Sequence, residues 1–164
     1  MATAASGAVI ASSRQGIHSG RYLGFRDALN EAGLACDERH IRFCTDTFDS
    51  GYAAALALFG EQPDISAVFV SNDLPALGVL NAAADRGLSV PADLSVVSIT
   101  DIHQAAQSRP SLSTVRIPTA EMAARGIELL LDLLEKRVVS GPVICIPDLT
   151  LIARQSTAAP RARD

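Results

Sequence analysis

The sequence predicts a domain of the α/β class, a parallel β-sheet with helices on both faces. Short uninterrupted apolar runs recur along the 164 residues, which is typical of strands that are covered on both faces. The runs are Gly7–Ala11, Ile65–Ser71, Leu94–Ile99, Val143–Ile146 and Leu149–Ile152. Segments with helical spacing lie between them, and 48% of the residues are hydrophobic, enough for one domain with a core.

Helices are predicted where apolar residues recur three or four positions apart. The three sets are Tyr22, Phe25 and Leu29; Leu77, Leu80 and Ala84; and Ile127, Leu130, Leu131 and Leu134. Gly33 and Gly87 are placed to end the first two helices, and Pro118 leads into the third. The helical pattern near residues 50–60 is weaker because it is apolar almost all round, and the polar segment after Arg154 is expected to be frayed.

The charge and the cysteine content indicate which partners and which cellular compartment to expect. The net charge of −4 comes without a basic stripe, so the chain is not expected to bind nucleic acid by itself. Cys36, Cys44 and Cys145 have no metal-ligand spacing and are odd in number, which favours a reducing compartment. We see no secretory signal and no apolar run long enough for a membrane span, and therefore expect a cytoplasmic protein.

Polar residues at the strand ends form the candidate site. Ligands of open parallel sheets bind outside the carboxyl ends of the strands. Arg21 follows the first predicted strand, Asn72 and Asp73 the second, and Asp101 the third, preceded by Thr100. These side chains would offer donors and acceptors to a small polar molecule.

Each candidate also has a purely structural interpretation. Asn72 or Asp73 would cap the following helix, Arg21 would be a solvated residue of a first helical turn, and Asp101 would stabilise a turn. We find no nucleophile elbow, phosphate-binding glycine loop or zinc-binding HExxH motif. The chain is accordingly not expected to be an enzyme, or to hold a metal or cofactor.

Six segments, in order, resemble the LacI/GalR family of bacterial transcription regulators. They are Arg21–Leu29 (RYLGFRDAL), Ala67–Leu80 (AVFVSNDLPALGVL), Gly87–Val97 (GLSVPADLSVV), Pro110–Pro118 (PSLSTVRIP), Glu121-Met122 with Ile127–Leu134, and Ile152–Pro160 (IARQSTAAP). Each is weak alone, but together they cover nearly the whole chain. The resemblance implies one lobe of a type I periplasmic-binding-protein-like fold, which senses a sugar-like effector in proteins that act as dimers or tetramers.

The resemblance also implies roles for individual residues. Arg21, Asn72 and the strand end at Thr100-Asp101 occupy positions that face the effector in the family, and Asp73 either joins them or caps its helix. Thr100 stands where relatives usually have a carboxylate that grips sugar hydroxyls. Asp46 stands where they often have a stacking aromatic. The effector is thus expected to be a small polar molecule rather than a stacked pyranose.

Domain boundaries follow from the same resemblance. Residues 1–116 are assigned to the second lobe, 117–143 to a crossover and a helix of the first lobe, 144–157 to a return strand, and 158–164 to a flexible tail. The DNA-binding head and most of the first lobe would precede Met1, so the chain is expected to be a truncated form. It would meet operator DNA only through that head, and the stripe from Ile127 to Leu134 would favour self-association.

Two rival functions remain at this point. A periplasmic sugar-binding protein of a transporter shares the fold and the Asn-Asp strand end, although the Arg-Gln-Ser-Thr ending at Arg154 fits regulators better. An α/β hydrolase would need a nucleophile or a metal site, and the sequence displays neither pattern.

Overall fold

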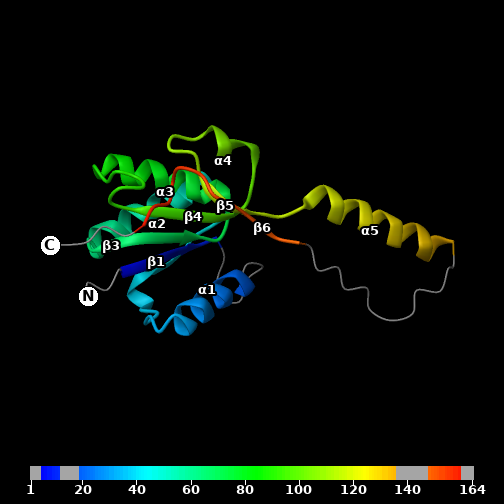
Figure 1. The fold of residues 1–164 in the computed structure, drawn as a ribbon, viewed down its shortest axis with the longest axis horizontal. Coiled ribbons are helices and arrows are strands. Elements are labelled where there is room, and N and C mark those ends of the chain that lie inside the picture. Colours follow the sequence, from blue (N-terminus) through cyan, green and yellow to red (C-terminus); the bar gives the residue numbers. More distant parts are fainter. Residues whose placement is uncertain (1–4, 12–18, 136–147, 160–164) are drawn as a thin grey trace.

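The computed structural model describes residues 5–11, 19–135 and 148–159. Its centre is a six-stranded sheet in the order β2-β1-β3-β4-β5-β6 (Figure 1). The strands are β1 (Ala5–Ile10), β2 (Ile41–Phe43), β3 (Ile65–Val70), β4 (Ser95–Thr100), β5 (Ser113–Arg116) and β6 (Thr150–Ile152). The first five are parallel, and β6 pairs antiparallel with β5 at the edge.

Helices lie on both faces of this sheet, which confirms the predicted fold class. They are α1 (Ser19–Glu31), α2 (Phe48–Glu61), α3 (Asp73–Asp85), α4 (His103–Gln107) and α5 (Thr119–Leu134), with a 3-10 turn, η1, at Glu38–His40. In Figure 1, α1 lies on one face, α2 and α3 lie on the other, and α5 projects away from the lobe. No helix among these described segments is long and apolar enough to cross a membrane.

The strand predictions agree with the structure at four of the apolar runs, which become β1, β3, β4 and β6. The predicted strand Val143–Ile146 lies outside the described residues. Strand β2 was not predicted, because three residues are too few for a recognisable pattern. Strand β5 falls within Pro110–Pro118, one of the six segments that resemble the family.

The helix boundaries follow the predicted glycines. Gly33 and Gly87 have φ values of 69° and 70°, a left-handed conformation that glycine adopts at no steric cost. The amide of Leu88 donates to the carbonyl of Ala83 at 2.9 Å, which closes the end of α3. Helix α2 begins after Thr47, whose hydroxyl accepts from the amide of Ser50 at 3.2 Å.

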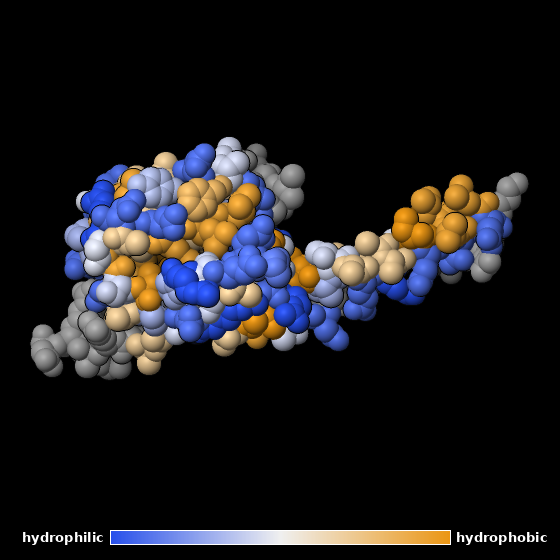
Figure 2. Space-filling model, turned by 90° about the horizontal axis from the view of Figure 1, so that it is seen from above, coloured by the Kyte–Doolittle hydropathy of each residue, from blue (hydrophilic) through white to orange (hydrophobic). Residues whose placement is uncertain are grey.

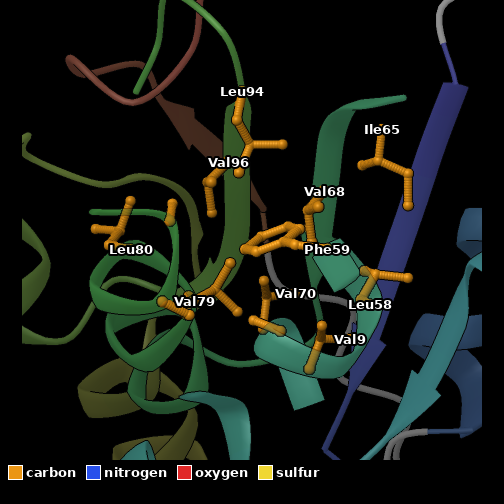
Figure 3. Packing of buried hydrophobic residues seen from close by; sticks show 14 of the residues in the cluster. Val9, Leu58, Phe59, Ile65, Val68, Val70, Val79, Leu80, Leu94 and Val96 are labelled. Carbon is orange, nitrogen blue, oxygen red and sulfur yellow. The ribbon is translucent and has the colours of Figure 1, made fainter. Parts of the chain in front are cut away.

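The main hydrophobic core lies between the sheet and the helices α2 and α3. Figure 3 shows side chains from both layers converging there, among them Leu58 and Phe59 of α2, Val79 of α3, and Val68 and Val96 of the sheet. A smaller cluster beneath α1 contains Tyr22, whose ring meets that of Phe43 edge to face at 5.7 Å between centroids.

The prediction that the chain frays after Arg154 is wrong for the residues that the structure describes. Ser156 is fully buried, and its hydroxyl accepts from the amide of Ser113 and donates to the carbonyl of Val96. The amide of Ala158 donates to the hydroxyl of Ser95 at 3.1 Å. Polar composition suggested a tail, but here the serine and backbone groups satisfy one another inside the fold.

Candidate functional site

The candidate site lies at the carboxyl ends of the parallel strands, where the loops to α1, α2 and α3 begin. Ser71, just past β3, fixes this edge: its hydroxyl accepts from the amide of Ala11 at 2.7 Å, and its own amide donates to the carbonyl of Val9. The ends of β1 and β3 are therefore held together directly beneath the predicted ligand residues.

Arg21, Asn72 and Asp46 form one hydrogen-bonded network at this edge. The guanidinium of Arg21, in the first turn of α1, donates to the carbonyl of Ser71 at 2.6 Å and to the side-chain oxygen of Asn72. The amide nitrogen of Asn72 in turn donates to the carboxylate of Asp46 at 2.6 Å. The structure thus brings together three residues that are separated by up to 51 positions in the sequence.

The network is partly buried and balanced in charge. Arg21 is half-buried, Asn72 is 8% exposed and Asp46 is open to solvent. Burial lowers the pKa of Arg21, while the nearby carboxylates of Asp46 and Asp73 act in the opposite direction. Arg21 stays protonated at neutral pH, so the site presents one cation and one anion joined by a neutral amide.

The structure does not give Asn72 the capping role that the sequence left open. Asn72 occupies the N-cap position of α3, but its side chain makes no capping hydrogen bond. Its two polar atoms are directed to Arg21 and Asp46 instead. Because the Asn72 side chain does not cap α3, the presence of Asn at this position is better explained by its contacts in the adjacent site than by helix stability.

Asp73 has a role that neither interpretation of the sequence predicted. It is 1% exposed, and its carboxylate accepts from the hydroxyls of Ser98 and Thr114 and from the amide of Ile102 at 2.8 Å. These partners belong to β4, β5 and the loop after β4, so Asp73 joins α3 to the middle of the sheet. It lies inside the fold, beneath the network rather than within it.

Thr100 and Asp101 end β4 with an unusual backbone. Their φ values are 145° and 64°, and a β-branched residue at positive φ is a genuine outlier. The side chain of Asp101 is 7% exposed and accepts from Arg116 Nε and Arg154 Nη2, both at 2.6 Å. Burial opposes ionisation of Asp101, but the hydrogen bonds from the two arginines leave its pKa below the usual value.

The predicted residues therefore separate into two groups. Arg21, Asn72 and Asp46 form the network, whereas the carboxylate of Asp101 is occupied by Arg116 and Arg154. The sequence did not single out either arginine as a partner of Asp101. Charge pairs between residues 53 positions apart leave no local spacing signal, and only the position of Arg154 in the family-like ending gave a hint.

The chemistry of this edge suits recognition of polar groups. Donors from Arg21 and Asn72 stand beside carboxylate acceptors of Asp46, and the Thr100 side chain lies at the next strand end. Within residues 5–11, 19–135 and 148–159, no group of three or more His, Cys, Asp and Glu side chains is arranged to hold a metal.

Comparison with known proteins identifies the family to which this fold belongs. The sequence model of the family described as periplasmic binding protein-like domain matches residues 6–157. The chain belongs to this family, in its LacI/GalR regulator branch. Catabolite control protein A of Priestia megaterium is 34% identical over 140 residues, 85% of this chain and 42% of that protein. The regulator GalR of Escherichia coli (strain K12) is 32% identical, over 85% of this chain and 40% of its own.

Solved structures of LacI/GalR regulators show the same fold. The complex of the transcriptional regulator CelR with cellobiose superposes with a TM-score of 0.87 at 30% identity, covering 92% of this chain and 46% of that chain. A sugar-binding LacI-family regulator of Escherichia coli, complexed with phosphate, gives 0.79 at 33% identity, covering 93% and 55%. The chain thus spans about two fifths of the curated relatives, and those relatives are regulators rather than enzymes.

Proposed function

We propose that this chain is an effector-sensing lobe of a LacI-type transcription regulator, and that a small polar, sugar-like molecule binds at the Arg21–Asn72–Asp46 network. The observation that carries the proposal is the network itself: the side chain of Asn72, at a helix start, is committed to Arg21 and Asp46 rather than to its helix. The CelR structure, which contains cellobiose, supports a sugar-like effector.

The balance of charge at the site favours an uncharged effector. Within the network the charges of Arg21 and Asp46 compensate each other, because Asn72, which joins them, is neutral. Hydroxyl groups can both donate to Asp46 and accept from Arg21, which an ionised carboxylate cannot do. Thr100, in place of a carboxylate, adds a hydroxyl without adding charge.

Regulation of DNA binding would involve parts of the regulator other than this lobe. Residues 1–116 would form the second lobe of a two-lobed clamp, 117–143 would cross to the first lobe, and 144–157 would return; the predicted tail of 158–164 would have to begin after Ala158, which is bonded to Ser95. Effector bound between the lobes would alter DNA binding by a separate helix-turn-helix head, in the cytoplasm. The names of the relatives, which are transcription regulators, support this arrangement over a transporter protein.

Substitution of Arg21 tests the proposed site. Titration calorimetry would measure binding of a panel of mono- and disaccharides, including cellobiose, to the chain and to Arg21→Ala. Because a partly buried charged hydrogen bond is lost, we expect the binding free energy to weaken by about 1–3 kcal/mol. Arg86→Ala is the matched control, since Arg86 also donates to one backbone carbonyl, that of Leu56, but lies at the far end of α3. Equal binding by Arg21→Ala and the unsubstituted chain would remove Arg21 from the site.

We expect the lobe alone not to bind DNA. The net charge of −4 opposes the phosphate contacts that supply most non-specific affinity for DNA. We therefore expect no mobility shift of duplex DNA by the purified chain at micromolar concentration and low salt. A shift under those conditions would contradict the assignment of DNA binding to a separate head.

A further inference from the structure

The backbone at the end of β4 is strained. Thr100 and Asp101 are the only residues other than glycine with positive φ values, 145° and 64°, within the described part of the chain. A β-branched residue such as threonine is sterically hindered there, and such a conformation persists only when the surrounding structure fixes it. The contacts around this turn must therefore supply the free energy that keeps it in place.

Two backbone groups of the turn are anchored to the lobe. The carbonyl of Thr100 accepts from the amide of Ile117, just past β5, at 3.3 Å. The amide of Ile102 donates at 2.8 Å to the carboxylate of Asp73, which is 1% exposed. The turn is thus held on both sides of Asp101, and the side chain of Asp101 adds a third anchor.

This third anchor is an ion-paired cluster, which we call the Asp101 clamp and which consists of Asp101, Arg116 and Arg154. One carboxylate oxygen of Asp101 accepts from Arg116 Nε and the other from Arg154 Nη2, both at 2.6 Å. Arg154 is itself fixed, because its Nη1 donates to the carbonyl of Leu112 at 2.7 Å and its backbone amide to the hydroxyl of Ser113 at 2.9 Å. Since each oxygen of Asp101 already accepts a charged donor and its side chain is 7% exposed, Asp101 is poorly placed to bind an effector directly.

The strained turn lies beside the proposed effector site. Phe69 of β3 pairs with Val97 of β4, and continuing this parallel register three residues along both strands brings Asn72 level with Thr100. Asn72 has an extended backbone, with φ −144° and ψ 154°, so the strand direction continues that far. The conformation of the turn therefore decides where the side chain of Thr100 stands relative to the Arg21–Asn72–Asp46 network.

We propose that Asp101 is a positioning residue of the effector site: the Asp101 clamp keeps the turn in its positive-φ conformation and so sets the side chain of Thr100 beside Asn72. Asp101 acts through Thr100 and does not contact the effector. This role differs from the one that the family resemblance implies, in which both residues face the effector. The action of the clamp on the turn follows from the contacts of Asp101, whereas its consequence for effector binding rests on the proposed function.

The two arginines of the clamp come from the segments that precede and follow α5 in the chain. Arg116 is the last residue of β5, shortly before α5 begins at Thr119, and Arg154 lies just past β6. Figure 2 shows α5 extending away from the lobe, with apolar side chains along one side. The clamp thus ties the turn at the site to both of these segments rather than to β4 alone.

Nuclear magnetic resonance tests the clamp without any effector. The three-bond coupling between the amide and α protons of Thr100 is small at a φ of 145° and large in an extended strand. Asp101→Ala and Arg116→Met should raise this coupling because an anchor is lost, and Asp101→Asn, which tolerates positive φ and keeps an acceptor oxygen, should raise it less. Arg125→Met is the matched control, since Arg125 also forms an ion pair at 2.6 Å, with Glu128, but on α5. A large coupling in the unsubstituted chain, or an unchanged coupling in the folded clamp variants, would overturn the proposal.

A double-mutant cycle tests whether Asp101 acts through Thr100. Titration calorimetry would measure binding of the mono- and disaccharide panel, including cellobiose, to Asp101→Ala, Thr100→Val and the double variant. Loss of one hydrogen bond to Thr100 should raise the dissociation constant roughly two- to tenfold, and Asp101→Ala should add little once the hydroxyl is gone. Effects that multiply in the double variant would show that Asp101 contacts the effector itself and would overturn the positioning role.

Arg116→Met keeps the test open if Asp101→Ala does not fold, because the Arg116 side chain is 55% exposed. This variant leaves the carboxylate of Asp101 in place and frees one of its oxygens. We expect weaker saccharide binding, since the turn is released, and equal or tighter binding would identify Asp101 as a direct ligand. If no saccharide binds the unsubstituted chain, the proposed function fails, while the coupling of Thr100 still decides whether the clamp holds the turn.

Discussion

The two faces of the sheet are built differently. On the face of α2 and α3, the helices approach so closely that a Cβ at Gly51 or Gly78 would come within 2.3 Å of a backbone oxygen of the other helix. On the face of α1, the strand residues Phe69 and Val97 are only half-buried. The first face holds the larger buried cluster, and the second leaves strand side chains partly exposed.

The largest expected contrast comes from removing one phenylalanine on each side. Phe59 of α2 is 6% exposed within the main core, and Phe59→Ala should lower the free energy of unfolding by about 3–5 kcal/mol. Phe69→Ala, on the half-covered face, should cost roughly 1–2 kcal/mol in the monomer, because part of the ring is already in contact with water. Urea unfolding at low protein concentration measures both, and equal losses would refute the contrast between the faces.

Alanine substitution of two helical glycines should give changes of opposite sign. Gly78→Ala is expected to destabilise the fold by about 1–3 kcal/mol, since its Cβ would collide with the carbonyl of Phe48. Gly24→Ala, in the interior of α1, meets no atom within 4 Å and should stabilise the fold by about 0.5–1 kcal/mol through helix propensity. Thermal unfolding of both variants measures the difference between a glycine at a close helix contact and a glycine exposed on a helix surface, and a stabilising Gly78→Ala would refute the close approach of α2 and α3.

The fold could be predicted from sequence where its signals are local, and could not where they depend on tertiary contacts. Apolar runs and terminal glycines predicted β1, β3, β4, α1 and α3, because these signals are local. The close approach of α2 and α3 depends on Gly51 meeting Pro75 and Gly78 meeting Phe48, which are tertiary contacts. The sequence identified α2 only weakly because its pattern is apolar almost all round, and it missed β2 because three residues are too few for a recognisable pattern.

The sequence predicted which residues lie at the candidate site, but not which of them contact one another. Strand ends gave Arg21, Asn72 and Asp101, because polar residues after apolar runs are visible in one sequence. That the carboxylate of Asp73 would accept from Ser98 and Thr114 depends on the start of α3 meeting β4 and β5, and no local spacing encodes it.

Two ion-paired carboxylates should respond differently to acid because their partners differ in exposure. Asp101 is 7% exposed between Arg116 and Arg154, whereas Asp37, in the turn after α1, is 32% exposed and is paired at 2.6 Å with Arg39, which is 77% exposed. The hydrogen bond from Arg39 lowers the pKa of Asp37 to about 2. The pKa of Asp101 is also lowered, since bonds from Arg154 and Arg116 outweigh the opposing effect of burial.

A carboxylate whose pKa is lower in the folded than in the unfolded state stabilises the fold above its ordinary pKa, and that stability is lost as the pH falls through the folded value. The free energy of unfolding of the unsubstituted chain should therefore exceed that of Asp101→Asn at pH 6, and the difference should shrink as the pH drops below 3.8. Asparagine tolerates the positive φ of Asp101, so the variant removes charge without adding backbone strain. For Asp37→Asn the difference should be smaller and should fade in high salt, because water screens an accessible ion pair. Denaturant unfolding from pH 6 to pH 2 measures both. A difference for Asp101→Asn that is independent of pH would show that its ionic pairs do not stabilise this edge of the lobe.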